Sequence, residues 1–207
     1  MSAKIKFNGT ITAVKARIRL LRSFDQVHHA YLGYTLVMDA VVDGKDWKGC
    51  RIAVGQKTHE KHIFLKGDHI SGEAVPIEHS EQEWADFYKV SGLKLISRGD
   101  ASENHPADMN GGIASPLSVY RENGHLRLDP KTYESKCSLC SWGLVMATEI
   151  ILDHWNPSRK KWRFETHCYG PRDCSNYRPG KPRTVQGRKP GMVWIDDDFE
   201  RARSGDY

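Results

Sequence analysis

The sequence predicts a mainly β protein, with five strands in its first hundred residues and a small hairpin module near its C-terminus. Three observations support this prediction. Apolar and polar residues alternate from Ile5 to Arg22, an Asp43-Gly44 pair separates two further apolar runs, and four cysteines form two close pairs between Cys137 and Cys174. Alternation with a period of two is typical of a strand that is buried on one face.

The first predicted strand, from Ile5 to Arg22, has one apolar face and one basic face. Val14, Ala16, Ile18 and Leu20 form the apolar face, and Lys15, Arg17 and Arg19 form the basic face. Because successive side chains of a strand point to opposite sides, we expect the apolar row to face the core and the basic row to face outward. Residues 23–33 are predicted to form a loop.

Four more strands are predicted after this loop. Asp43-Gly44 is typical of a tight hairpin turn, because both residue types tolerate positive φ. The polar segment Gln56–Lys66 is expected to contain a helical turn. The four strands are expected at residues 34–42, 49–54, 69–76 and 88–97, with Cys50, Ile52 and Val54 on the inner face of the second of these.

This order of strands resembles the OB-fold, a five-stranded and partly open barrel. The resemblance covers residues 4–98 and depends on strand order and spacing. An SH3-like barrel is the nearest alternative. The resemblance implies a binding face, which in OB-folds is often used for single-stranded nucleic acid or oligosaccharide, although a fold alone does not fix a function.

Basic and aromatic residues of the predicted barrel indicate contact with nucleic acid, because phosphates bind Lys and Arg while bases stack on aromatic rings. The candidates are Lys15, Arg17, Arg19, Arg22, Phe24, Tyr31 and Arg51. The alternative is an ordinary solvated strand face. The loop at residues 78–87 is acidic and would repel phosphate, so with Trp84 it is instead a candidate contact for a protein partner.

Residues 99–136 are predicted to connect two modules, and their first half is rich in the Asp, Asn, Pro and Gly of linkers. Asn123-Gly124 fits either the end of a short helix or a hairpin turn between residues 119–122 and 125–128. We favour the hairpin because apolar and polar residues alternate after the turn. Asp129-Pro130 then predicts the start of one helical turn.

The cysteine pairs have the spacing of metal ligands. Cys137-Ser-Leu-Cys140 and a second pair, Cys168 and Cys174, are separated by 27 residues. Two such pairs can supply four thiolates to one tetrahedral ion, and Zn²⁺ favours closed sulfur sites. We therefore predict a structural zinc site with these four ligands. A disulfide pair and an iron–sulfur cluster are the alternatives. Four thiolates saturate tetrahedral zinc and leave no position for a catalytic water.

The insert between the two pairs predicts a hairpin, with an apolar segment at 144–153 and an alternating one at 161–166. Together with the cysteines, this hairpin resembles the zinc-ribbon architecture, with an insert longer than the usual one. The resulting organisation is an OB-like barrel at 1–98, a connector at 99–136, a four-cysteine zinc-ribbon-like module at 137–180, and a basic arm with an acidic tail at 181–207.

Charge is distributed unevenly along the chain. The net charge is +5 overall, but residues 137–194 carry +6 and residues 195–207 carry −3. A basic module suggests an anionic partner, and a cationic arm typically follows phosphate backbones. The candidates in this part are Arg159, Lys160, Lys161, Arg163, Arg172, Arg178, Lys181 and Arg183. The alternative is a solvated linker that wraps the domain.

No apolar signal region is present at the N-terminus, and no segment approaches the ~20 apolar residues of a membrane span. The protein is therefore expected to be cytoplasmic and without a membrane partner. Thiols stay reduced in that compartment, where paired cysteines hold metal more often than they form disulfides.

The sequence contains no Walker loop, nucleophile elbow, dinucleotide fingerprint or kinase motif, so an enzyme is not expected. His59 and His62 are interpreted as surface residues, and Cys50 as a buried hydrophobe.

Three hypotheses follow. The first is a protein that binds single-stranded or structured DNA or RNA. The second is an adaptor subunit of a larger assembly, which contacts its partner through the 78–87 loop and the acidic tail. The third is a metal-dependent hydrolase or nuclease that uses Asp25, His28, His29 and Glu60.

Overall fold

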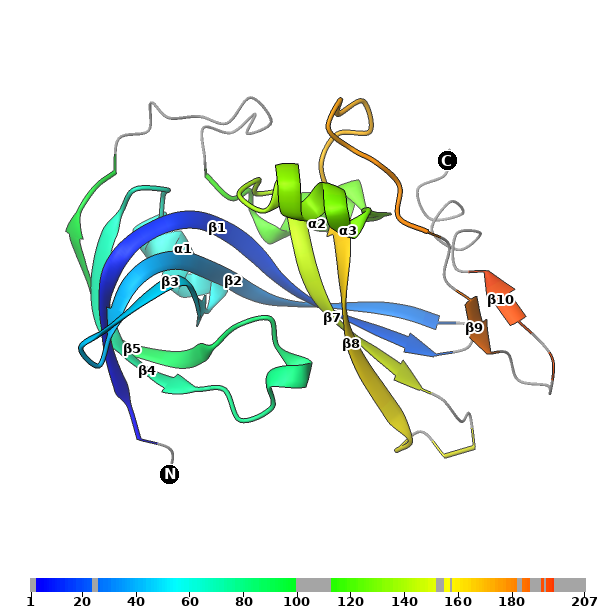
Figure 1. Cartoon of the computed structure of the whole chain (residues 1–207), viewed down its shortest axis with the longest axis horizontal. Coiled ribbons are helices and arrows are strands. Elements are labelled where there is room, and N and C mark those ends of the chain that lie inside the picture. The colour runs from blue at the N-terminus through cyan, green and yellow to red at the C-terminus, as the bar shows by residue number, and fades with distance from the viewer. Residues whose placement is uncertain are drawn as a thin grey trace.

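The computed structural model describes residues 3–23, 26–99, 113–151, 155–156, 158–181, 184–186, 191 and 193–195. Strands dominate these residues and the helices are short, so the predicted mainly β class is confirmed (Figure 1). None of the helices described by the structure has the length and apolar character needed to cross a bilayer.

Five strands close into a ring in the N-terminal half. They are β1 (Ile5–Ser23), β2 (Gln26–Val42), β3 (Lys45–Val54), β4 (His69–Pro76) and β5 (Phe87–Ser97). β1 pairs in antiparallel fashion with both β2 and β4, β2 pairs likewise with β3, and β4 with β5. One parallel pair, Ile52 with Phe87, joins β3 to β5 and completes the ring. The strands expected at 69–76 and 88–97 are confirmed.

The turn, the helical segment and the buried face of β3 that the sequence predicted in this half are present in the structure. Asp43 and Gly44 form the turn between β2 and β3 with φ values of 45° and 80°. The polar segment after β3 forms helix α1 (Gln56–His62), and a short 3₁₀ turn, η1 (Ser80–Gln82), precedes β5. The inner face of β3 is as predicted, because Cys50, Ile52 and Val54 are buried.

The loop predicted at residues 23–33 is wrong. β2 begins at Gln26 and continues through that segment to Val42. Its first half pairs with the second half of β1, where Leu21 lies opposite His28 and Ile18 opposite Tyr31. The long first strand offers a continuous partner, and pairing of this kind outweighs the weak strand propensity of a polar, His-containing segment.

The C-terminal half extends the same sheet. β7 (Gly143–Ile151) and β8 (Lys160–Cys168) form the predicted hairpin, and the short β6 (Leu126–Arg127) pairs with β8. β7 also pairs in parallel fashion with the end of β1, through residues 147–150. The result is one eight-stranded sheet that runs from the ring into the hairpin. A separate two-stranded sheet holds β9 (Thr184–Gln186) and β10 (Val193–Ile195).

The hairpin favoured at residues 119–128 is wrong, and the helical alternative is correct. Helix α2 (Leu117–Asn123) ends at Gly124, which has a φ of 66°. Leu117 and Tyr120 are both buried. These two residues are three positions apart, which places them on one face of a helix, and this burial decides the outcome.

The turn predicted at Asp129-Pro130 is confirmed. The Asp129 carboxylate accepts a hydrogen bond from the backbone N–H of Thr132 at 2.9 Å and caps the short helix α3 (Pro130–Thr132). A single π-helical turn, η2 (Tyr133–Cys137), follows and leads the chain to the first cysteine pair.

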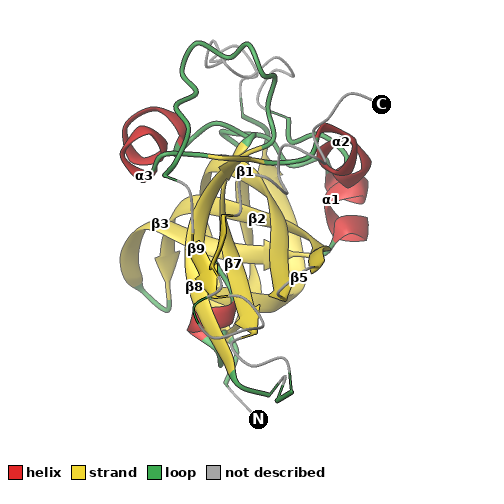
Figure 2. Cartoon of the chain, turned by 90° about the vertical axis from the view of Figure 1, so that its right-hand side faces the viewer, coloured by secondary structure: helices red, strands yellow, loops and turns green. Residues whose placement is uncertain are grey.

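A single hydrophobic core connects the ring and the hairpin. The apolar row of β1 is buried as predicted, with Val14, Ala16, Ile18 and Leu20 all in the core. The same cluster continues into Trp142 and Tyr169 of the C-terminal half. Viewed from the side, the helices lie outside the sheet, with α3 on one side and α1 and α2 on the other (Figure 2). The ring and the hairpin therefore share both a sheet and a core.

Candidate nucleic-acid interface and cysteine centre

The fold brings the two cysteine pairs together. Cys137 and Cys140 flank the turn between η2 and β7, while Cys168 ends β8 and lies opposite Gly143 of β7. Cys174 follows one turn later. All four line one small cavity of about 20 Å³. A water molecule needs roughly 10–15 Å³ measured in this way, so the cavity has room for one small ion.

The four cysteines are free thiols, and Cys174 is the most exposed of them. Burial raises the pKa of the Cys168 thiol to about 11, and the three neighbouring cysteines add to this increase. Among the described residues, no three His, Cys, Asp or Glu side chains are arranged as a formed metal site. The donor set nevertheless fits a metal centre with four cysteine ligands, because all four cysteines line one ion-sized space.

The turn that carries Cys137 and Cys140 is tightly closed. The backbone N–H of Cys140 donates to the carbonyl of Cys137 at 3.2 Å, and that of Gly143 donates to the carbonyl of Cys140 at 3.3 Å. A Cβ at Gly143 would lie 2.7 Å from the carbonyl oxygen of Cys137, closer than real contacts allow. The position therefore requires glycine. On the second pair, Gly170 donates its N–H to the sulfur of Cys168 at 3.4 Å.

Lys15 is not on an outward face, so the prediction of exposure is wrong for this residue. Its side chain is fully buried and points into the turn of the first cysteine pair. The Nζ donates to the carbonyl oxygens of Cys137 at 3.2 Å, Cys140 at 2.7 Å and Gly143 at 2.6 Å. It also lies 5.3 Å from the ring centre of Tyr133. The basic face of β1 is covered here by the C-terminal half of the chain, which sequence alternation does not reveal.

Arg17 and Arg19 are half-buried and pair with the acidic loop. The Glu83 carboxylate forms ion pairs with both guanidinium groups, at 3.8 Å to Arg17 and with a direct hydrogen bond to Arg19. The Arg19 guanidinium also lies over the ring of Trp162. Burial lowers the pKa of Arg17, Glu83 partly offsets this effect, and Arg19 adds to the lowering.

Arg51 makes a similar contact on β3. Its guanidinium donates to both carboxylate oxygens of Asp86, at 2.6 and 3.1 Å, and lies 5.2 Å from the ring centre of Trp84. Two of the loop's acidic residues, Glu83 and Asp86, are thus used to neutralise basic residues of the ring. The sequence indicated that this acidic loop would repel phosphate, but in the structure these two carboxylates are neutralised by arginines of the ring.

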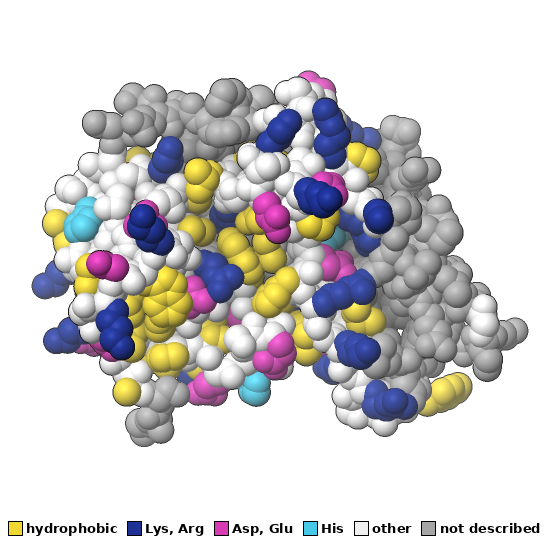
Figure 3. All heavy atoms as spheres, in the orientation of Figure 1, with side chains coloured by type: hydrophobic (Ala, Val, Ile, Leu, Met, Phe, Trp, Pro, Cys, Tyr) yellow, Lys and Arg dark blue, Asp and Glu magenta, His cyan; other side chains and the backbone are white. Residues whose placement is uncertain are grey.

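Two clefts on the same side of the molecule meet at Phe164 of β8, whose side chain is 44 % exposed. One, of about 700 Å³, lies against the β7–β8 hairpin and is lined by the four basic residues Arg127, Lys131, Arg163 and Lys181. The other, of about 520 Å³, extends toward the ring and is lined by Trp47, which is 43 % exposed, and by Arg51 with the carboxylates of Glu83 and Asp86, both of which are engaged by arginines of the ring. Hydrophobic side chains lie in the middle of the face in Figure 3, with charged ones around them.

Two acidic side chains line the cleft against the β7–β8 hairpin, and each of them binds a neighbouring side chain or backbone group. Asp129 accepts hydrogen bonds from the N–H and the hydroxyl of Thr132, which lower the pKa of its carboxyl group. Glu165 forms an ion pair with Arg163. Lys131 and Lys181 are exposed at the cleft. The cleft therefore combines basic side chains with an exposed aromatic ring.

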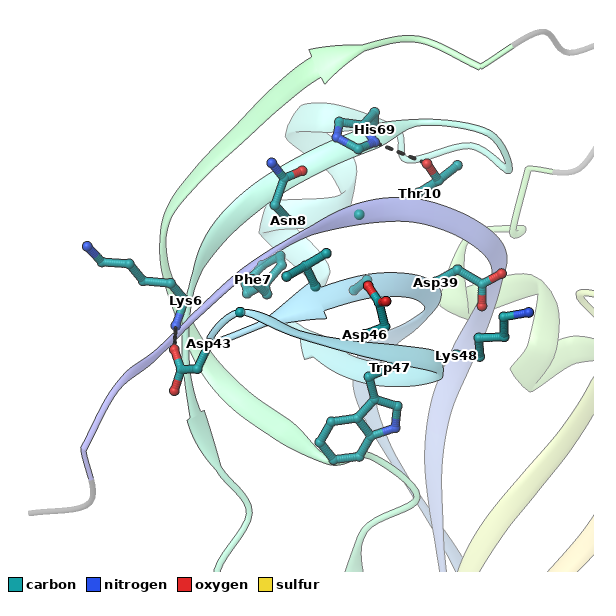
Figure 4. A pocket seen from close by; sticks show the side chains of 14 residues that line it. Lys6, Phe7, Asn8, Thr10, Asp39, Asp43, Asp46, Trp47, Lys48 and His69 are labelled. Carbon is teal, nitrogen blue, oxygen red and sulfur yellow. Dashed lines mark hydrogen bonds between the residues drawn. The ribbon is translucent and has the colours of Figure 1, made fainter.

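A third cleft, of about 850 Å³, lies on the outside of the ring and is less suited to an anion (Figure 4). Asp39, Asp43 and Asp46 line it, against the cations of Lys6 and Lys48. Asp43 accepts the backbone N–H of Lys6 at 2.8 Å, and Asp39 accepts that of Gly49 at 3.0 Å. Three carboxylates at one cleft repel phosphate.

The remaining basic candidates of the C-terminal half are exposed where the structure describes them. Lys160 forms an ion pair with Glu149 at 2.7 Å, and Arg178 donates to the carbonyl of Tyr177 at 2.7 Å. The other exposed members of this set are Arg159, Lys161 and Arg172. Arg183, Phe24 and the side chain of Arg22 lie outside the described residues, as does the acidic tail from Asp196 onward.

Tyr31 is part of an aromatic group that the sequence did not indicate. The guanidinium of Arg121 lies 4.8 Å from its ring centre. Beside it, the imidazoles of His29, His125 and His167 form a row with ring centres 4.6 and 5.0 Å apart. These histidines come from β2, the segment before β6, and β8, so only the tertiary fold brings them together.

The residues of the third hypothesis are not assembled into a metal site in the described part of the chain. Glu60 on α1 accepts a hydrogen bond from Gln56 at 2.7 Å, whereas His29 packs against His125. Asp25 lies outside the described residues. The interpretation of His59 as a surface residue is wrong, since it is buried with its ring 4.0 Å from that of Tyr34.

Comparison with known proteins found no matching family model, no similar curated protein and no similar solved structure.

Proposed function

We propose that the protein binds single-stranded nucleic acid across the two clefts that meet at Phe164. The observation that supports this proposal is the exposure of two aromatic side chains, Trp47 and Phe164, in adjoining clefts, one of which is lined by four basic residues. Stacking on aromatic rings and contact with phosphates are the two interactions that non-specific single-strand binders combine.

In this proposal the cleft of about 700 Å³ against the β7–β8 hairpin makes the main phosphate contacts. Lys131, Arg163 and Lys181 are exposed there, and Phe164 between them provides a stacking platform. Lys15, Arg17 and Arg19 of β1 are not part of the proposed interface. Lys15 is buried, and Arg17 and Arg19 are paired with Glu83 and less exposed than Arg163, so these three stabilise the protein instead of contacting the ligand.

The ring is proposed to be an OB-fold. Along the chain it has three strands, the helix α1 and two more strands, which is the order of elements on which the resemblance to that fold depends. The C-terminal half is proposed to be a zinc-ribbon-like module with one structural Zn²⁺ on Cys137, Cys140, Cys168 and Cys174. When bound, the ion would cross-link the two ends of the β7–β8 hairpin, and metal binding of this kind contributes directly to folding.

The alternative of a protein-interaction adaptor depended on the acidic loop at residues 78–87. In the structure Glu83 and Asp86 are occupied by arginines of the ring, and Trp84 lies under Arg51. This engagement favours nucleic-acid binding over the adaptor hypothesis.

The test is a titration of the full chain with fluorescent single-stranded and duplex DNA and RNA, followed by anisotropy between roughly 50 and 200 mM salt. We expect single strands to bind more tightly than duplexes. Three phosphate contacts give a slope of log K against log salt of roughly −2. Absence of binding to every oligonucleotide at the lowest salt would overturn the proposal.

A further inference from the structure

The first cysteine pair is held by a lysine from the opposite half of the chain. Cys137 and Cys140 lie more than 120 residues after Lys15, yet the Lys15 ammonium donates to the backbone of both. A third donor–acceptor contact joins it to Gly143, where β7 begins. A lysine ammonium has three N–H donors, and the three carbonyls use all of them.

These contacts define the geometry of the turn. A two-residue gap between metal ligands requires the chain to fold back sharply, and Lys15 draws the three carbonyls of this turn toward a single point. The carbonyls then face the ammonium, while the four cysteines line the neighbouring cavity. The side chain thus positions the backbone of the ligand residues directly.

The charge of the buried ammonium has a second consequence. A divalent ion bound by four thiolates carries a net charge of −2, and burial of such a charge is costly unless positive charge is close by. Lys15 is fully buried and is hydrogen-bonded to two of the four cysteines. Because it belongs to β1, the charge is supplied by the ring.

We propose that Lys15 is the positioning residue of a four-cysteine zinc centre, and that it couples metal binding in the C-terminal hairpin to the N-terminal ring. The inference depends on the proposed zinc centre and is independent of nucleic-acid binding. Removal of groups that orient metal ligands typically lowers metal affinity by about 10- to 100-fold. We expect a loss of this size when the ammonium is removed.

The test compares the full-length wild type with Lys15→Met, which retains the length of the side chain without its charge and donors. Lys6→Met is the matched control, since Lys6 lies on the same strand and is exposed. Zinc content is measured by atomic absorption, and affinity by competition with a chromophoric chelator. We expect one zinc per chain, a loss of about 10- to 100-fold for Lys15→Met, and wild-type affinity for Lys6→Met.

Two results would overturn different parts of the argument. A wild-type chain that binds no zinc overturns the zinc centre and the role of Lys15 together. Equal zinc affinity in the wild type and in folded Lys15→Met overturns only the role of Lys15.

A second measurement needs no variant and covers the case in which Lys15→Met does not fold. The zinc-loaded and chelator-treated wild type are labelled with an amine-reactive reagent, and labelling of each lysine is quantified by peptide mass spectrometry. We expect labelling of Lys15 to increase on zinc removal, while Lys6 is labelled equally in both samples. Unchanged protection of Lys15 would contradict the coupling.

Discussion

The Lys15 ammonium lies 2.6 Å from the carbonyl oxygen of Gly143, 128 residues further along the chain. This contact joins the middle of β1 to the first residue of β7. Further along β1, residues 19–22 pair in parallel fashion with β7. The C-terminal half therefore covers the basic face of β1 at Lys15, while Glu83 pairs with Arg17 and Arg19 on the same face, and these charges contribute to stability.

Glu83 is the residue whose loss tests this internal role most directly. Its carboxylate is 17 % exposed and neutralises both Arg17 and Arg19. Glu83→Gln leaves two neighbouring guanidinium groups without that carboxylate. Hydrogen bonds to charged groups contribute roughly 1.5–3 kcal/mol, so we expect the free energy of unfolding in urea to fall by about 2 kcal/mol.

Glu81→Gln is the matched control for Glu83→Gln, because Glu81 lies in the same loop with its side chain 53 % exposed. We expect this variant to unfold at the same urea concentration as the wild type. Equal stability of the two variants would show that the Glu83 ion pairs contribute nothing measurable.

The proposed interface leads to a prediction about charge reversal. Lys131→Glu combined with Lys181→Glu reverses two exposed charges at the cleft against the β7–β8 hairpin. Each lost phosphate contact reduces the magnitude of the salt slope by about 0.7 for single strands, so we expect the slope to become shallower by roughly 1.4. Anisotropy titrations over the salt series described above measure this change.

The control for charge is Lys61→Glu combined with Lys94→Glu, two exposed lysines on α1 and β5. These substitutions alter the net charge equally but lie outside both clefts. Equal loss of binding in the two double variants would indicate that only net charge matters.

Phe164→Ala tests stacking separately, and we expect it to cost about 1–3 kcal/mol of binding free energy at every salt concentration.

The sequence was sufficient to predict the strands that carry clear local signals. Alternation and the Asp43-Gly44 turn correctly placed β1, β4, β5 and the turn between β2 and β3, because these signals depend on residues near in sequence, whereas β2 and β3 begin earlier than expected, at Gln26 and Lys45. Burial of Tyr120 in α2 was not predictable in this way, since the surface that covers it comes from elsewhere in the chain.

In the candidate site, too, sequence patterns could not predict contacts between residues that are far apart in the chain. Alternation correctly separated the two faces of β1 but could not indicate that the polar face would be covered too. Lys15 was therefore assigned to solvent, although it is fully buried against the Cys137–Gly143 turn. The row of His29, His125 and His167 likewise depends on three distant segments. The four cysteines line one cavity, and the zinc site that their paired spacing predicts stays a prediction.

His59 predicts a specific dependence of stability on pH. Its buried ring packs between Tyr34 and Phe64, and burial lowers its pKa, although Glu60 and a hydrogen bond with the backbone of Ala114 oppose that shift. Below about pH 6.5 the unfolded chain therefore binds a proton at this position more readily than the folded protein does. The free energy of unfolding must fall as pH decreases from about 6.5 toward the lowered pKa of the folded state.

His59→Phe retains an aromatic ring at this position and cannot bind a proton. We expect the loss of stability between about pH 7.5 and 5.5, measured by urea unfolding, to be smaller in His59→Phe than in the wild type, because the proton uptake of the unfolded chain at this position is removed. His79→Phe removes a histidine whose side chain is 68 % exposed and is expected to retain the wild-type difference. A wild-type pH dependence in His59→Phe would show that the buried imidazole does not limit stability in acid.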